Sequence, residues 1–128
     1  VGSTSGHGGQ HFITAYCVSK GALMTMTKNV AYQLMRHQVR VVTVNPGWMD
    51  TPGEDVTQRR YHGADDGWLA EAEATRPWGR LVKVPELVTT LAFVLSDDAG
   101  MMSGTIIDFD QSVQGAGDPP MPPPELGP

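Results

Sequence analysis

The segment Val39–Val44 constrains the fold of this chain most strongly, because five of its six residues are β-branched. Such residues favour extended backbone, and the Asn45-Pro46-Gly47 that follows ends the extension with a turn. The segment is also almost continuously apolar, whereas a strand with one face in water alternates between apolar and polar residues. It therefore predicts a short strand that is covered on both faces, as in a parallel sheet.

Two amphipathic helices are predicted, one on either side of this strand in the chain. The first runs from about Ala15 to His37 and has no internal proline. Its expected buried stripe is spaced by three and four residues and consists of Leu23, Met26, Val30 and Leu34. The second begins at Pro85, which suits a first helical turn, and closes at Ser96-Asp97-Asp98. Its expected buried residues are Leu87, Val88, Leu91, Val94 and Leu95.

Between the first strand and the second helix, Thr51–Trp78 is polar and predicts an excursion from the core, with weak helical stretches near Val56–Tyr61 and Trp68–Ala74. Thr105–Asp110 predicts a last strand. Residues 118–128 form a proline-rich tail for which we expect extended geometry. We therefore expect the folded domain to occupy residues 1–117.

The order helix, strand, helix, strand predicts an α/β layered fold. Two strands are too few for a self-sufficient sheet with both faces buried, and the chain begins in a glycine-rich loop. We therefore expect the N-terminal half of a larger sheet to be missing from this segment. In isolation the segment should leave an apolar sheet edge open and should aggregate or pair with itself.

Composition narrows the class of function. The 128 residues have a net charge of −5 with acidic and basic residues interspersed, which argues against a nucleic-acid-binding surface. We find no apolar run near the ~20 residues that a membrane span needs, and no secretion signal at the first residues. Cys17 is the only cysteine, which excludes an intrachain disulfide and fits a cytoplasmic protein. We expect it to be a half-buried helical residue rather than a reactive thiol.

A candidate catalytic pair opens the first helix. Tyr16 and Lys20 are four residues apart, so both side chains lie on one helix face. A nearby cation favours the phenolate, and a tyrosine tuned in this way can donate a proton to a developing alkoxide or accept one in reverse. Alone, the pair is also compatible with a solvated surface contact.

Three further features favour chemistry at the same place. Ser3 precedes Tyr16 in the glycine-rich loop, where a hydroxyl can donate a hydrogen bond to a substrate carbonyl oxygen. Pro46 and Gly47 follow the first strand, and ligands in open α/β sheets bind outside the carboxyl ends of strands. Thr51 comes shortly afterwards and has a hydroxyl that can bind a carboxamide.

These residues resemble one family. STSGHGGQHFITAYCVSKGAL is similar to the Ser…Tyr-x-x-x-Lys segment of short-chain dehydrogenases/reductases, and VRVVTVNPGWMDTP resembles their next strand with its Pro-Gly-x-x-x-Thr turn. RPWGRLVKVPELVTTLAFVLSDDAGMMSGTIIDFD resembles the sequence that ends in their last strand. The likeness runs from Val1 to about Gly117.

The resemblance implies the C-terminal part of a Rossmann-type, doubly wound parallel sheet, and an oxidoreductase that transfers a hydride between NAD or NADP and a carbonyl or alcohol. Tyr16 would be the general acid/base, Lys20 would support it and bind the nicotinamide ribose, and Ser3 would polarise the carbonyl. Together with Tyr16 and Lys20, three residues would bind the cofactor: Pro46, Gly47 and Thr51. The family also implies a homotetramer or homodimer, built partly through the long helix after Tyr16 and through the last helix and strand.

The sequence departs from the family in four ways. The glycine-rich turn for the pyrophosphate, the residue that selects NAD or NADP, and the family's active-site asparagine are not in this segment. Asp110-Gln111-Ser112 stands where the family has Asp-Gly-Gly. A truncated, non-catalytic Rossmann-like module for binding or interaction is therefore the alternative. The resemblance implies a small-molecule substrate, of the sugar or polyol type or a 3-oxoacyl thioester. The aromatic and basic residues of the excursion favour a sugar or polyol.

Several conspicuous residues have two interpretations each. His7 and His11 have the spacing of two metal ligands, but they sit among glycines, so we expect no metal and place one of them beside the substrate. Arg59 and Arg60 can bind an anion or form a solvated helix face, and we favour the solvated face. Three tryptophans flank or occupy the excursion and can stack on a substrate or pack the excursion onto the core: Trp48, Trp68 and Trp78.

Overall fold

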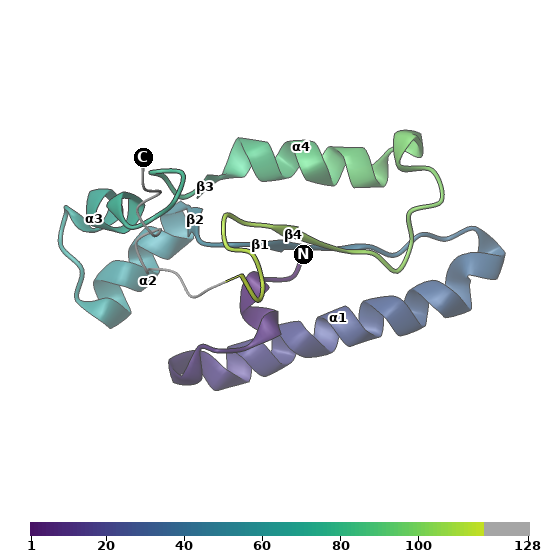
Figure 1. Ribbon diagram of the computed structural model, residues 1–128, viewed down its shortest axis with the longest axis horizontal. Helices are drawn as coiled ribbons and strands as arrows, with labels where there is room; N and C mark the ends of the chain where they lie inside the picture. Colours follow the sequence, from purple (N-terminus) through teal and green to yellow (C-terminus); the bar gives the residue numbers. More distant parts are fainter. Residues whose placement is uncertain (117–128) are drawn as a thin grey trace, which may run out of the picture.

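Two long helices cover the two faces of a parallel pair of strands in the computed structural model, which describes residues 1–116 (Figure 1). The long elements are α1 (Thr14–Leu34), β1 (Thr43–Pro46), α2 (Pro52–His62), α3 (Trp68–Ala74), α4 (Val84–Leu95) and β4 (Ile106–Phe109). Short ones are η1 (Thr4–His7), η2 (His11–Ile13), η3 (Met35–His37), β2 (Met49–Asp50), β3 (Val82–Lys83) and η4 (Asp97–Ala99). The predicted α/β class with parallel strands is confirmed. The proline-rich tail lies outside the described residues.

Strand β1 lies in the middle of this arrangement. It pairs in parallel with β4, from Thr43 opposite Ile106 to Pro46 opposite Phe109. On its other side, the N–H of Gly2 donates to the carbonyl of Val44 at 2.8 Å. Backbone hydrogen bonds therefore reach β1 from both of its edges, while α1 and α4 cover its two faces, as the apolar sequence predicts.

The strand begins and ends later than the sequence predicts. Val39–Val42 is not paired as a strand, whereas Asn45 and Pro46 belong to β1. Proline fits here because only every second residue of the strand directs its N–H toward β4. Thr43 and Gly47 are such residues and donate to carbonyls on the β4 side, whereas Pro46 is not. The missing N–H of Pro46 therefore costs the ladder no hydrogen bond toward β4.

The face that α1 turns to the sheet differs from the predicted stripe. Its buried residues are small, namely Cys17, Thr27 and Ala31, and Met26 is exposed. Small side chains let the helix approach the strand, and the Thr27 hydroxyl bonds the hydroxyl of Thr43. The prediction that Met26 is buried is therefore wrong.

Helix α4 covers the opposite face through Leu87 and Val94, which form an apolar core with Val44 of β1. This part of the predicted stripe is confirmed. Val88 and Leu95 were expected to be buried and are exposed. Each follows a buried residue by one position, about 100° further around the helix, and so faces away from the sheet.

The excursion contains the two predicted helical stretches. Helix α3 has the predicted bounds, whereas α2 begins earlier, at Pro52, because the Thr51 hydroxyl caps it by accepting the N–H of Glu54 at 3.0 Å. A second parallel pair, β2 with β3, was not predicted. Two residues per strand are too short for a periodic signal. Across residues 1–116, no helix is long and apolar enough to cross a membrane.

Candidate active site

The candidate site lies where α1 begins and β1 ends. Helix α1 runs antiparallel to β1, so its first turns lie toward the carboxyl end of the strand (Figure 1). The loop with η1 packs on the same turns of α1. The topology thus gathers the predicted residues of the loop, the helix and the strand end at one edge of the sheet, where open α/β sheets bind ligands.

Tyr16 and Lys20 lie on one face of α1, as the spacing predicts. The Lys20 ammonium nitrogen is 5.5 Å from the centre of the Tyr16 ring. Tyr16 is 45% exposed, although it is an aromatic residue next to the core. The phenol is therefore accessible to a ligand and has a cation at close range.

Ser3 is buried and forms the N-cap of η1, where its Oγ accepts the N–H of Ser5 at 3.2 Å. Gly2, the residue before Ser3, is fixed against β1 by its hydrogen bond to Val44. At Gly6, three residues after Ser3, a Cβ would lie only 2.8 Å from the carbonyl carbon of Lys20. Only glycine permits this approach, so the loop of Ser3 rests directly on the helical turn that carries Lys20.

Pro46, Gly47 and Thr51 follow one another around the carboxyl end of β1. Pro46 is buried, and a side chain at Gly47 would collide with the carboxylate of Asp110, which follows β4. Thr51 uses its Oγ1 as the acceptor of the α2 cap. A hydroxyl that accepts one hydrogen bond can still donate another, so Thr51 retains a donor for a ligand.

Comparison with known proteins identifies the family. Residues 1–113 match the family model described as enoyl-(acyl carrier protein) reductase. L-xylulose reductase of Bos taurus is 38% identical over 98 residues, which are 76% of this chain and 38% of that protein. The chain belongs to the short-chain dehydrogenase/reductase family. It spans less than half of the length of the relatives described here.

Solved structures of short-chain dehydrogenases agree. A short-chain dehydrogenase family protein from Francisella tularensis has 32% identity and a TM-score of 0.75, over 86% of this chain and 47% of that one. The aldohexose dehydrogenase of Thermoplasma acidophilum has 25% identity and a TM-score of 0.82, over 97% of this chain and 49% of that one. The predicted Rossmann-type fold class and family are therefore confirmed.

The two histidines of the loop in this short-chain dehydrogenase/reductase do not act together. His7 Nε2 contacts both carboxylate oxygens of Asp108, at 2.8 and 3.0 Å, whereas the ring of His11 lies edge-on to Phe12. The described residues contain no group of three His, Cys, Asp or Glu side chains that could hold a metal ion. The pairing of His7 with Asp108 was missed because 101 positions separate the two residues.

Asp108 is held in its charged form by two donors. Burial alone would raise the pKa of this carboxyl group, but hydrogen bonds from His7 and from Asn45 outweigh burial and hold the pKa below its usual value. The Asn45 amide donates to Oδ1 of Asp108 at 3.0 Å, directly across the β1–β4 ladder. A polar contact thus joins the η1 loop to both strands.

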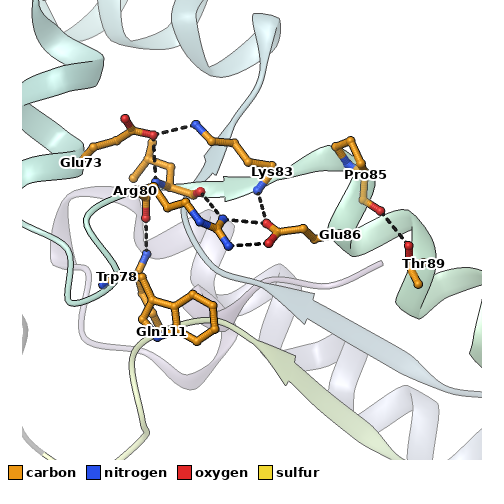
Figure 2. A network of polar contacts seen from close by, with 9 residues as sticks. Glu73, Trp78, Arg80, Lys83, Pro85, Glu86, Thr89 and Gln111 are labelled. Carbon is orange, nitrogen blue, oxygen red and sulfur yellow. Dashed lines mark hydrogen bonds and ion pairs between the residues drawn. The ribbon is translucent and has the colours of Figure 1, made fainter.

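A network of charges fixes the base of the excursion (Figure 2). Arg80 forms a two-pronged pair with Glu86, and Lys83 binds Glu73 at 2.6 Å and Asp50 at 2.9 Å. These partners raise the pKa values of Arg80 and Lys83 and lower those of Glu73 and Glu86, with side-chain hydrogen bonds as the largest cause in each case.

Gln111 accounts for the departure from the family's Asp-Gly-Gly. Its amide nitrogen donates to the carbonyl of Arg80 at 2.8 Å, and its oxygen accepts the N–H of Trp78 at 3.0 Å (Figure 2). The side chain therefore ties the end of β4 to the base of the excursion, a connection that glycine cannot make.

The remaining candidates of the excursion are mostly structural. Trp68 is 7% exposed, stacks on Trp48 with ring centres 6.3 Å apart, and donates to Asp55. These two tryptophans pack the excursion, whereas Trp78 is 72% exposed. Arg59 forms exposed ion pairs with Asp55 and Asp66, which agrees with the predicted solvated face.

Proposed function

We propose that this chain forms the catalytic end of an oxidoreductase that transfers a hydride between NAD or NADP and a carbonyl or alcohol. The observation that carries the proposal is the approach of Lys20 to the exposed Tyr16 at 5.5 Å, next to the loop of Ser3, in a short-chain dehydrogenase/reductase. Tyr16 is 45% exposed and so open to a ligand, whereas Arg59, Arg80 and Lys83 are paired with carboxylates.

In this mechanism Ser3 and Tyr16 act on one oxygen atom of the substrate, and Lys20 acts through Tyr16. During reduction, the Ser3 hydroxyl donates a hydrogen bond to the carbonyl oxygen and stabilises the charge that develops there. Tyr16 gives its phenolic proton to that oxygen as it becomes an alkoxide, and Lys20 stabilises the tyrosinate that results. Oxidation of an alcohol uses the same steps in reverse.

The described residues fit the nicotinamide end of the cofactor. A bound dinucleotide supplies the hydride, and the protein supplies position and charge. Lys20 has the donors to bind ribose hydroxyls, and Thr51 has a hydroxyl for the carboxamide. Pro46 and Gly47 lie at the carboxyl end of β1, shortly before Thr51 in the chain, and would line the nicotinamide site there. Which of the two dinucleotides binds depends on residues beyond these.

A sugar or polyol is the substrate class that we favour. L-xylulose reductase is the curated relative with 38% identity, and an aldohexose dehydrogenase has a TM-score of 0.82. An acyl thioester is the second candidate, which the description of the family model and a probable 2,4-dienoyl-CoA reductase of Caenorhabditis elegans, 33% identical over 107 residues, support. A cytoplasmic homodimer or homotetramer completes the proposal.

Substitution of Tyr16 tests the proposal. In the full-length protein, Tyr16→Phe removes the proton donor and keeps the ring, so turnover should fall by about 10²-fold to 10⁴-fold while NADH or NADPH still binds. Tyr32→Phe is the matched control, because Tyr32 is on the same helix and is 78% exposed. Unchanged turnover in Tyr16→Phe would remove Tyr16 from the mechanism. Cofactor binding without any turnover in the unsubstituted protein would favour a non-catalytic binding module.

A further inference from the structure

The contact between His7 and Asp108 joins two parts of the chain that the family resemblance does not connect. His7 ends η1, whose N-cap is Ser3, and Asp108 lies in β4. The imidazole nitrogen is within hydrogen-bond distance of both carboxylate oxygens, and the side chains are only 25% and 36% exposed. Both residues lie within the stretches that resemble the family, but neither is among the residues to which the resemblance gives a role.

Asn45 holds Asp108 in the orientation that His7 requires. It is completely buried, lies opposite Asp108 in the ladder, and donates from Nδ2 to Asp108 Oδ1 at 3.0 Å. A second contact of the same nitrogen, with the Met24 sulfur at 3.2 Å, fixes the amide against α1. The carboxylate is thus held from the strand side and presents its oxygens to His7.

Asn45 also limits the start of the Ser3 loop. A side chain at Gly2 would collide with Asn45 Oδ1, so only glycine fits there. Gly2 is in turn bonded to Val44. The segment from Gly2 to His7 therefore has three attachments: β1 at its first residue, α1 at Gly6, and β4 at its last residue. Ser3 lies between the first two, and the pair of His7 with Asp108 is the only one of the three that is made by two side chains.

We propose that His7, through its bond to Asp108, is a positioning residue that sets the place of the Ser3 hydroxyl. This inference rests on the proposed function, because it assigns a partner to Ser3 in the same reaction. Without the third attachment, the end of η1 loses its contact with β4, and the place of its N-cap at Ser3 then depends on Gly2 and Gly6 alone. A misplacement of about 1 Å at a reacting group can cost about 10²-fold in rate.

Turnover of His7 variants of the full-length protein tests the role. His7→Ala should lower kcat by about tenfold to 10²-fold, with little change in the KM of the cofactor, because the nicotinamide contacts belong to other residues. His7→Gln keeps an N–H donor and should restore kcat to within about threefold. His37→Ala is the matched control, since His37 is exposed at the far end of α1.

A double-mutant cycle with Ser3 separates positioning from general loss of structure. If His7 acts through the serine hydroxyl, His7→Ala should have no further effect on kcat once Ser3→Ala has removed that hydroxyl. If His7→Ala does not fold, Asp108→Asn takes its place, because it keeps the side-chain shape and removes the charge.

The outcomes distinguish the two proposals. A slow Ser3→Ala variant, combined with a His7→Ala effect that is absent or that multiplies fully with it, would overturn the positioning role and leave the proposed function intact. A Ser3→Ala variant with the turnover of the unsubstituted protein would overturn the role of Ser3 itself, and the positioning role with it. Non-additive losses together with rescue by glutamine would support the inference.

Discussion

Lys20 holds its ammonium nitrogen 5.5 Å from the ring centre of Tyr16, one turn along the same helix. The helix fixes this relationship, because residues four apart lie above one another on its surface. Gly6 packs against the backbone of Lys20 itself, so the serine loop, the lysine and the tyrosine share one rigid element. A rigid element is the support that a catalytic constellation needs.

Removal of the lysine charge should slow the reaction without unfolding the protein. Lys20→Met keeps much of the side-chain volume and removes the cation, so kcat should fall by about 10²-fold and cofactor binding should weaken. Lys28→Met provides the control, because Lys28 is exposed two turns further along α1. Steady-state kinetics of both variants measure the effect. Equal kinetics in the two would contradict a role for Lys20.

Two glycine-to-alanine substitutions should have opposite effects on stability. At Gly47 the new Cβ would collide with the Asp110 carboxylate, whose oxygens are held by the Gln111 N–H and the Ser112 hydroxyl. We expect Gly47→Ala to lower the free energy of unfolding by about 1–3 kcal/mol. Gly53→Ala, in α2 with space around it, should raise it by up to about 1 kcal/mol. Urea denaturation measures both, and destabilisation by Gly53→Ala alone would contradict the packing described.

Lowering the pH should reduce the stability of the fold, partly through protonation of Glu73. The hydrogen bond from Lys83, and next the one from the Leu81 N–H, hold the pKa of this carboxyl below its ordinary value of 4.5. A carboxyl group with a lowered pKa stabilises the fold above its ordinary value, and this stabilisation is lost as the pH falls through the value in the fold.

We therefore expect Glu73→Gln to be less stable than the unsubstituted protein at pH 7 and to lose less stability on acidification below about pH 4.5. Glu71→Gln, an exposed position on the same helix, is the control. Urea denaturation at pH 7 and below about pH 4.5 measures how the free energy of unfolding of each protein changes with pH. Parallel pH profiles for Glu73→Gln and the unsubstituted protein would show that the ion pair with Lys83 contributes nothing.

The tryptophans of the excursion should differ in their effect on stability. Trp68 is buried against Trp48 and bonded to Asp55 at 2.7 Å, so Trp68→Ala should cost about 3–5 kcal/mol. Trp78 is exposed and contacts the Arg80 guanidinium at 5.5 Å, a contact worth at most about 1 kcal/mol at the surface. Thermal unfolding of both variants measures this contrast. Similar losses of stability would show that the excursion is not packed through Trp68.

The sequence predicted the elements whose signals are local. Long periodic patterns predicted both main helices, and a weak helical stretch matched the bounds of α3. A β-branched run followed by Pro46-Gly47 placed the first strand to within a few residues. The spacing of Tyr16 and Lys20 was enough to place them on one helix face. These features depend on residues near one another in the chain.

Features that depend on distant residues were not predictable in the same way. Which face of α1 is buried depends on the close approach to Thr43, where a small residue is preferred over the larger Met26. The contact of His7 with Asp108 and the bridge from Gln111 to Arg80 join residues 101 and 31 positions apart. The pairing of β2 with β3 involves two residues on each side. No short-range pattern encodes these contacts.

Isotope transfer tests the central claim most directly. The full-length protein is incubated with NADH or NADPH that carries deuterium at the transferable position of the nicotinamide, together with L-xylulose or an aldohexose. We predict that the alcohol product carries the deuterium with at least one cofactor, and that Tyr16→Phe nearly abolishes the transfer while Tyr32→Phe leaves it unchanged. Equal transfer by Tyr16→Phe and the unsubstituted protein would contradict the assignment of Tyr16 as the proton donor.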